Sequence, residues 1–152
     1  MTPTAIAVRT VDTTADFGAL VDCRRRWTLE QGGPDEADFA ERMADWSERV
    51  GAARHSWLAW SADHPVGMVT LVVYERMPRP GAPPGRWAYV GQLWVDPAYR
   101  RHGVGRALMA ALIGWATEAG MQRLVLNPSE VSRPLYAALG FRSAVDLLRL
   151  DL

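Results

Sequence analysis

The sequence of 152 residues has no lysine, a single cysteine and no net charge. Its 17 basic residues, all arginine, match 17 acidic ones, which argues against nucleic acid or a membrane surface as the main partner because both favour a basic excess. The lone Cys23 excludes an internal disulfide and, within an apolar pattern, is expected to be a packed thiol. The three histidines lack metal-ligand spacing, so no metal is assigned. No apolar run is long enough to span a membrane and no signal-peptide pattern opens the chain, so we expect a soluble, cytoplasmic protein.

Hydrophobic residues make up 49% of the chain, which suits one folded domain over residues 1–152. Apolar spacing predicts elements in the order β-α-α-β-β-β-α-β-α-β-β. Strands are expected at 6–11, 56–61, 66–74, 87–95 and 122–127, with one or two closing strands in 141–150. Helices are expected at 13–29, 34–50, 103–119 and 132–139, with a proline-rich loop at 75–86. Hairpin strands followed by a strand–helix–strand crossover predict an α/β or α+β domain with a mixed sheet.

The stretch 100–106, Arg-Arg-His-Gly-Val-Gly-Arg, places three arginines and two glycines where a strand turns into a helix. Helix N-termini leave N–H groups unpaired and carry partial positive charge, and glycine lets a phosphate approach the backbone closely. This pattern favours a pyrophosphate site; the alternative is a surface arginine cluster beside a flexible turn. It is not a Walker A loop, because neither lysine nor Ser/Thr follows the glycines. It is not G-x-G-x-x-G either, because Leu108 occupies the third glycine position.

Arg100-x-x-Gly103-x-Gly105 resembles the Q/R-x-x-G-x-G/A signature of GNAT-type N-acetyltransferases. The segment SRPLYAALGF, residues 132–141, resembles the later helix-and-turn segment of that family, and the spacing between the two suits it. The element order of nearly the whole chain matches as well, although residues 1–85 match in that order alone. The resemblance implies a GNAT-like α/β (α+β) fold, in which helices flank a mixed, mostly antiparallel central sheet.

The resemblance also implies acetyl-CoA as the cofactor, with CoA as product. The residues expected to bind it lie on the strand 87–95, in the glycine turn and after the strand 122–127: Leu93, Trp94, Val95, Arg100, Arg101, His102, Gly103, Val104, Gly105, Arg106, Asn127, Ser132, Arg133 and Tyr136. Backbone amides of the glycine turn would hold the pyrophosphate, and the strand 87–95 would hydrogen-bond the pantetheine arm. In this family the strands corresponding to 87–95 and 122–127 splay apart, and the acetyl group lies in the gap.

Tyr136 is expected to be the general acid that protonates the departing thiolate, the alternative being an ordinary tyrosine of an amphipathic helix. Many relatives carry a carboxylate on the strand before the glycine turn, but here Gly91 and Gln92 stand there. Glu75, at the end of the preceding strand, is therefore the predicted general base, directly or through water; otherwise it is a solvated charge and water alone takes the proton. Two weaker carboxylate candidates near the bend between the first helices are Glu30 and Asp35.

The expected activity is direct transfer of an acetyl group from acetyl-CoA to a primary amine of a small molecule or peptide, since a thioester needs no covalent enzyme intermediate. The alternative is a non-catalytic acyl-CoA-binding or sensing module of the same fold. No nucleic acid or membrane partner is expected, and a homodimer is allowed because relatives often dimerise. The run 24–26 either meets an acidic acceptor or forms a solvated helix face. Five tryptophans either line an aromatic acceptor pocket or pack in the core: Trp27, Trp57, Trp60, Trp87 and Trp94.

Overall fold

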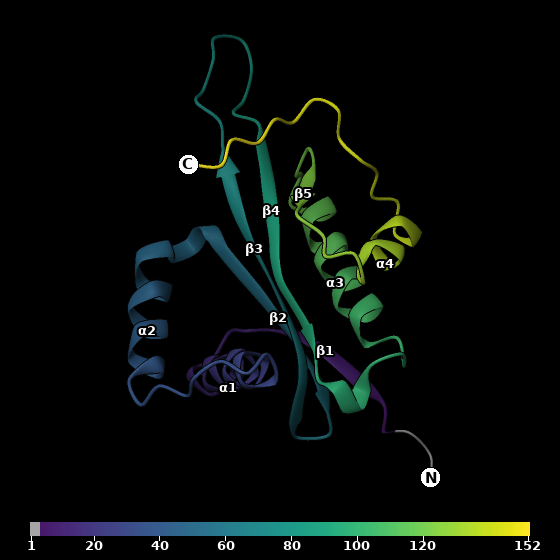
Figure 1. Ribbon diagram of the computed structural model, residues 1–152. Coiled ribbons are helices and arrows are strands. Elements are labelled where there is room, and N and C mark those ends of the chain that lie inside the picture. The colour runs from purple at the N-terminus through teal and green to yellow at the C-terminus, as the bar shows by residue number, and fades with distance from the viewer. Residues whose placement is uncertain (1–3) are drawn as a thin grey trace.

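The computed structural model describes residues 4–152, so residues 1–3 of the expected domain lie outside the described part. A five-stranded sheet in the order β1-β2-β3-β4-β5 forms its centre (Figure 1). Its strands are β1 (Ile6–Thr10), β2 (Arg54–Ser61), β3 (His64–Glu75), β4 (Arg86–Val95) and β5 (Leu124–Leu126). Neighbours from β1 to β4 run antiparallel, whereas β5 runs parallel to β4. The predicted mixed, mostly antiparallel sheet is confirmed.

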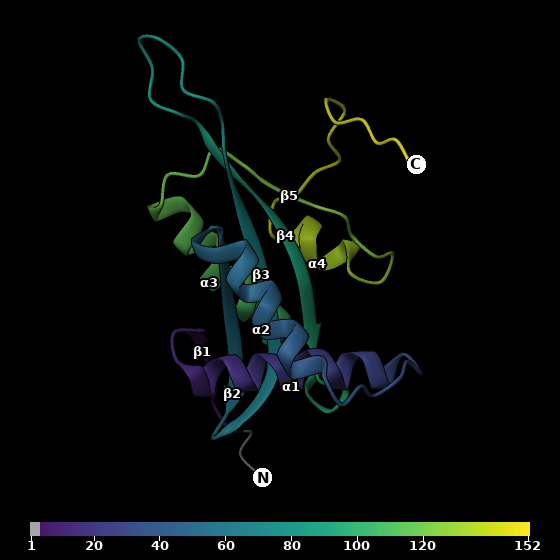
Figure 2. The ribbon, with the colours of Figure 1, turned by 90° about the vertical axis from the view of Figure 1, so that its left-hand side faces the viewer.

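Helices cover both faces of the sheet. One face carries α1 (Thr14–Glu30) and α2 (Phe39–Val50), and the other carries α3 (Val104–Glu118) and α4 (Arg133–Ala138) (Figure 1, Figure 2). Two 3₁₀ turns, η1 (Gly51–Ala53) and η2 (Pro97–Tyr99), precede β2 and follow β4. Within residues 4–152, no helix is long and apolar enough to cross a membrane.

Apolar side chains form two buried clusters. Leu108 of α3 belongs to the cluster that includes Val69, while Leu20 and Cys23 of α1 belong to the cluster that includes Met68. β3 contributes to both clusters because successive residues of a strand point to opposite faces of the sheet. Cys23 is fully buried, so the packed thiol expected from the sequence is confirmed. Burial raises the pKa of this thiol to about 12.

The second helix begins later than the sequence predicts. It starts at Phe39 and not at Pro34, and residues 34–38 form a linking segment without helical structure. Two ion pairs hold this segment against the flanking helices: Arg25–Asp35 at 3.0 Å and Arg42–Glu36. The acidic side chains that suggested a helical first turn are therefore used in tertiary contacts.

The closing strands predicted in 141–150 are absent, so the order ends with α4. After α4, several residues of the segment 141–147 line a cavity together with β5, and the last part of the chain projects away from the sheet (Figure 2). An alternating pattern predicts a strand, but a strand needs a hydrogen-bonded neighbour. Residues 141–150 form no ladder with the outer edge of β5, so within residues 4–152 the sheet ends at β5. The apolar side chains of this segment with exposed fractions of 82% or more are Val145, Leu148, Leu150 and Leu152.

Candidate active site

The sheet opens between β4 and β5. Their parallel pairing runs from Ala88 opposite Leu124 to Val90 opposite Leu126, where β5 ends. β4 continues to Val95, so on this side its last residues have no strand neighbour within the described residues. Backbone N–H and C=O groups in that position are open to a ligand that lies alongside the strand.

A β-bulge marks the point of opening. Thr70 of β3 lies opposite Gly91, but Met68 lies opposite Trp94, so Gln92 and the residue after it oppose a single residue of β3. Gln92 has a φ of 59°, in the left-handed region that glycine favours. Bulges of this kind are common beside active sites, where they redirect the strand.

The N-terminus of α3 points into the same region and has no cap of its own. Gly103 is the N-cap residue at a φ of 81°, and the first intrahelical bond runs from the Ala107 N–H to the Gly103 carbonyl at 2.9 Å. The amides before Ala107 therefore have no intrahelical acceptor. α1 differs, because Thr13 and Asp16 satisfy its first turn with a reciprocal capping box.

The charges of the first turn of α3 also favour an anion. This turn has no acidic residue and carries Arg106, although acids are the residues that the positive end of a helix favours. A Cβ placed on Gly105 would lie 3.5 Å from Leu135 and 3.8 Å from Val95, so the turn sits close to α4 and to the end of β4. A phosphate group bound here would accept from the free amides and balance the arginine.

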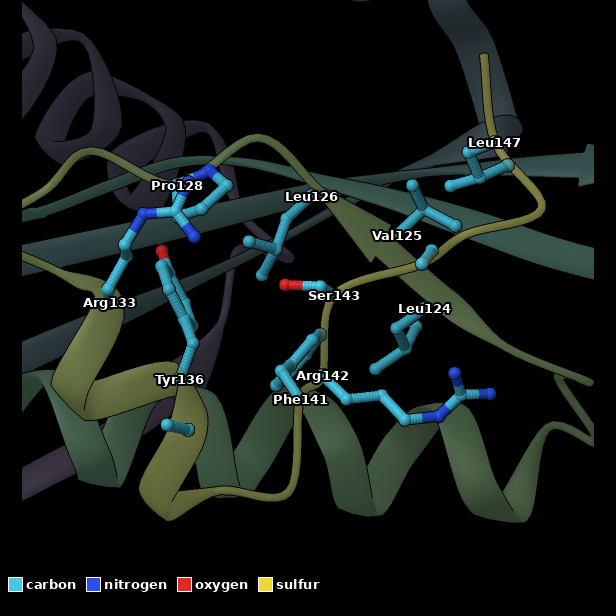
Figure 3. A pocket seen from close by; sticks show the side chains of 12 residues that line it. Leu124, Val125, Leu126, Pro128, Arg133, Tyr136, Phe141, Arg142, Ser143 and Leu147 are labelled. Carbon is cyan, nitrogen blue, oxygen red and sulfur yellow. The ribbon is translucent and has the colours of Figure 1, made fainter.

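Tyr136 of α4 lies beside the opening. It lines a cavity of about 420 Å³ with Leu126, Pro128 and Arg133, and Figure 3 shows its hydroxyl pointing towards the last two. Burial raises the pKa of Tyr136 above its ordinary value of 10.0, so the phenol stays protonated at neutral pH. Its ring packs edge-to-face on Phe141, with the ring centroids 5.6 Å apart. The hydroxyl makes no hydrogen bond within residues 4–152, which leaves its proton available.

The side chain of Arg100 is committed to structure. Its guanidinium pairs with Glu30 at 2.6 Å and donates to the Val95 carbonyl at 2.9 Å. Glu30 also accepts from the Trp94 indole at 2.8 Å. Burial opposes ionisation of Glu30, but the hydrogen bonds from Trp94 and Arg100 outweigh it and hold its pKa below the usual value. Glu30 thus ties α1 to the loop before α3 and is a poor proton acceptor.

Other predicted cofactor residues surround the opening with varied partners. Arg101 and His102 are exposed beside the glycine turn, and Asn127 is exposed directly after β5. Ser132 donates to the Ser129 carbonyl at 3.0 Å. Arg133 pairs with Glu130 at 3.0 Å.

Glu75, the predicted general base, is not brought to the opening. It lies at the exposed end of β3 opposite Arg86, whereas Thr70 lies opposite Gly91 at the bulge. Glu75 lies five residues beyond Thr70 along the strand, which is roughly 16 Å. Direct proton transfer from an amine at the opening to Glu75 is incompatible with this geometry.

A second cavity, of about 570 Å³, lies between α1, α2 and the sheet, and no motif in the sequence indicated its lining. Its lining combines apolar, basic and polar side chains: Leu20, Arg24, Phe39, Arg42, Met43, Asp45, Trp46, Arg49, Met68, Thr70 and Gln92. Gln92 belongs to the bulge, so this cavity reaches the opening from the other face of the sheet. The available signal was the apolar spacing of Phe39, Met43 and Trp46, which suggested core packing.

None of the five tryptophans proposed for an acceptor pocket lines this cavity. Trp57 and Trp94 are buried in the core, and Trp87 stacks on Tyr74 with the ring centroids 4.9 Å apart. The aromatic side chains that line the cavity are instead Phe39 and Trp46. The core-packing alternative thus holds for the two buried tryptophans.

A model of the Acetyltransferase (GNAT) family matches residues 20–141, most of the chain. The chain belongs to this family. Glucosamine 6-phosphate N-acetyltransferase of Trypanosoma brucei brucei is 32% identical to this GNAT chain over 110 residues, which cover 72% of this chain and 73% of that protein. Family membership confirms the class expected from the sequence, an acetyl-CoA-dependent acetyltransferase.

Solved structures agree with this assignment. A Clostridium acetobutylicum acetyltransferase with acetyl-CoA matches at a TM-score of 0.76 and 21% identity, over 97% of this chain and 96% of that one, a likeness that establishes the GNAT fold. A Trypanosoma brucei acetyltransferase matches at a TM-score of 0.74 and 25% identity, over 97% of this chain and 100% of that one.

Proposed function

We propose that this protein transfers the acetyl group of acetyl-CoA to a primary amine of a small molecule or peptide. The observation that carries the proposal is the opening between β4 and β5, which has an uncapped helix N-terminus and Tyr136 beside it and a second cavity reaching it at Gln92. Such an arrangement brings two reactants to one point, which supplies much of the rate of a bimolecular reaction.

The cofactor is proposed to lie along the end of β4. Its pyrophosphate accepts from the backbone amides of residues 103–106, with Arg106 and Arg101 supplying charge. Its pantetheine arm hydrogen-bonds backbone groups of residues 93–95 that face the opening, as an added strand would, except for the Val95 carbonyl, which accepts from Arg100. Arg100 supports this site through its bond to the Val95 carbonyl. Asn127, Ser132 and Arg133 are proposed as further contacts from the other side of the opening.

The chemistry is direct aminolysis of a thioester. The amine nitrogen attacks the carbonyl carbon, a C–N bond forms, and the C–S bond breaks. Tyr136 donates its phenolic proton to the departing sulfur and recovers a proton from solvent. Water takes the proton that the amine loses, because Gly91 and Gln92 offer no carboxylate and Glu75 is distant.

A non-catalytic acyl-CoA-binding module is the second candidate. It is favoured by the lack of a carboxylate at positions 91 and 92, whereas the buried, protonated Tyr136 beside the opening favours catalysis.

The deciding experiment follows thiol release from acetyl-CoA in the presence and absence of a panel of primary amines. Amine-dependent release, with a product heavier by one acetyl group, is expected. Binding of acetyl-CoA without release for any amine would favour the non-catalytic module. The cytoplasmic location and the homodimer expected from the sequence both stay predictions.

A further inference from the structure

The cavity between α1 and α2 contains an excess of positive charge. Its lining includes three arginines, Arg24, Arg42 and Arg49, and one acid, Asp45. The protein as a whole has no net charge, so the excess of positive charge in the cavity does not reflect a generally basic chain. Desolvation in a cavity strengthens the attraction of such a cluster for an anion.

Of the three consecutive arginines of α1, residues 24–26, one lines the cavity and two make structural ion pairs. Arg25 pairs with Asp35 at 3.0 Å, and Arg26 pairs with Asp22 and donates to the Pro65 carbonyl at 2.8 Å. Successive helix residues point about 100° apart, so they have different neighbours.

Arg24 faces the cavity and is held in place without a carboxylate. It donates to the Thr28 hydroxyl at 2.9 Å, and its guanidinium lies 4.8 Å from the centre of the Trp27 ring. Within residues 4–152, no acidic side chain pairs with it. Burial lowers the pKa of Arg24, as expected for a cation that lacks a compensating anion.

The two arginines of α2 reach the cavity from the opposite wall. Arg42 and Arg49 are seven residues apart, two helical turns, and therefore lie on one face of α2. Arg42 forms an ion pair with Glu36 at the rim of the cavity, whereas Arg49 has no acidic partner among the described residues.

The rest of the lining indicates how an acceptor with an anionic group and an amine would lie in the cavity. Phe39, Met43 and Trp46 form an apolar wall of the cavity. No residue of α2 is fully buried, so these side chains stay accessible from the cavity. Gln92 lies at the bulge, beside the opening where the acetyl group is proposed to arrive. An acceptor that fills the cavity would thus have its anion among the arginines and its amine towards Gln92.

We propose that this cavity recognises amines that carry an acidic group, a phosphate or a carboxylate, and that Arg24 and Arg49 bind that group. The proposal rests on the function proposed above, because it identifies the cavity as the acceptor site. Both acids present oxygen atoms that a guanidinium binds with charge-assisted hydrogen bonds.

The test is isothermal titration calorimetry on the CoA-loaded protein with probe pairs that differ in the acidic group. One pair is glucosamine 6-phosphate and glucosamine, and the other is phenylalanine and phenylalaninamide. At least one acidic member is expected to bind about tenfold or more tightly than its neutral partner, because charge-assisted bonds are the strong ones. The pair with the larger preference shows whether the natural acid is a phosphate or a carboxylate.

Variants show whether the preference comes from these side chains. Arg24→Gln and Arg49→Gln are each expected to lower the acidic preference by about tenfold without weakening the neutral probe. Arg49→Lys should keep most of it because the charge remains. Arg149→Gln is the matched control, because Arg149 pairs with Asp151 in the exposed C-terminal segment. The preference should also fall as salt rises.

The proposal is overturned if acidic probes bind no more tightly than neutral ones, if none of the probes binds, or if the preference survives both glutamine variants. Acetyl-CoA binding and thiol release with neutral amines are measured on the same samples. If acetyl-CoA binds and thiol is released with neutral amines, but acidic and neutral probes bind equally, the acidic acceptor alone is rejected. The absence of binding and release would reject the proposed function itself.

Discussion

Tyr136 combines three properties that suit a proton donor for the leaving thiolate. It is buried, its hydroxyl has no hydrogen-bond acceptor within residues 4–152, and it lies beside the opening of the sheet. Its ring is held by packing on Phe141, so the hydroxyl is positioned without bonds of its own. Removing the oxygen should therefore affect chemistry and leave the fold intact.

We expect Tyr136→Phe to lower kcat by about 10²–10⁴-fold, the usual contribution of general acid catalysis. Acetyl-CoA binding and the thermal midpoint should stay close to those of the wild type. Steady-state thiol release and thermal unfolding measure the two effects. A variant with unchanged kcat would remove Tyr136 from the mechanism.

The pH dependence of Glu30 gives a second prediction. Its pKa in the folded protein is lower than the ordinary 4.5, so its ionised form stabilises the native state above pH 4.5, and this stabilisation is lost as pH falls through the lowered value. Glu30→Gln should lower the free energy of unfolding at pH 7 by about 1 kcal/mol or less. Urea unfolding at pH 7 and pH 3 should show the difference between the two proteins shrinking in acid. A difference that grows in acid would contradict the assignment.

The individual residues differ in how far the sequence predicted them. Gly103, Gly105 and Tyr136 could be proposed from the sequence because each belongs to a short motif whose geometry is local. Glu75 does lie at the end of its strand as expected, but its distance from the bulge depends on the register of a long hairpin, which no short motif encodes. Arg24 was left open because its neighbours on a second helix decide which way it faces.

Two glycines, one at the N-cap of α3 and one inside the helix, illustrate opposite uses of that residue. Gly103 adopts a φ of 81° at the N-cap, whereas Gly114 lies exposed inside the helix, where an added Cβ would meet nothing within 4 Å. Gly103→Ala should destabilise the protein by about 1–2 kcal/mol, the cost of a left-handed alanine. Gly114→Ala should stabilise it by about 1 kcal/mol, the difference in helix propensity. Urea unfolding of both variants measures these effects, and equal effects would contradict the left-handed turn.

Most helices and strands were predictable, because apolar spacing reports directly on which face of an element is buried. The failures occurred where the spacing has no packing partner. The alternating residues of 141–150 have no adjacent strand, and residues 34–38 are held by ion pairs to Arg25 and Arg42. The cavity proposed for the acceptor was hard to predict because its lining comes from α1, α2, β3 and β4, and the stripe on α2 that lines it looks like a core stripe.

The exposed C-terminal segment suggests how two chains would associate. Val145, Leu148, Leu150 and Leu152 are exposed, and the outer edge of β5 has no strand partner within the described residues. Exposed apolar residues next to an unpaired edge favour pairing between chains. We expect sedimentation velocity to give the mass of two chains, and the double change Leu148→Asp with Leu150→Asp to give the mass of one. A monomeric wild type would contradict the homodimer.

The proposed site as a whole depends on acetyl-CoA binding at the uncapped turn of α3, and thermal unfolding with and without acetyl-CoA tests this proposal most directly. Gly105→Glu puts a carboxylate at the free amides where its Cβ makes only ordinary contacts, while Gly114→Glu is the same change on an open part of α3. At 100-fold excess over Kd, acetyl-CoA should stabilise the wild type and Gly114→Glu by about 2.7 kcal/mol and leave Gly105→Glu unchanged. No stabilisation of the wild type, or equal stabilisation of all three proteins, would contradict acetyl-CoA binding at this turn.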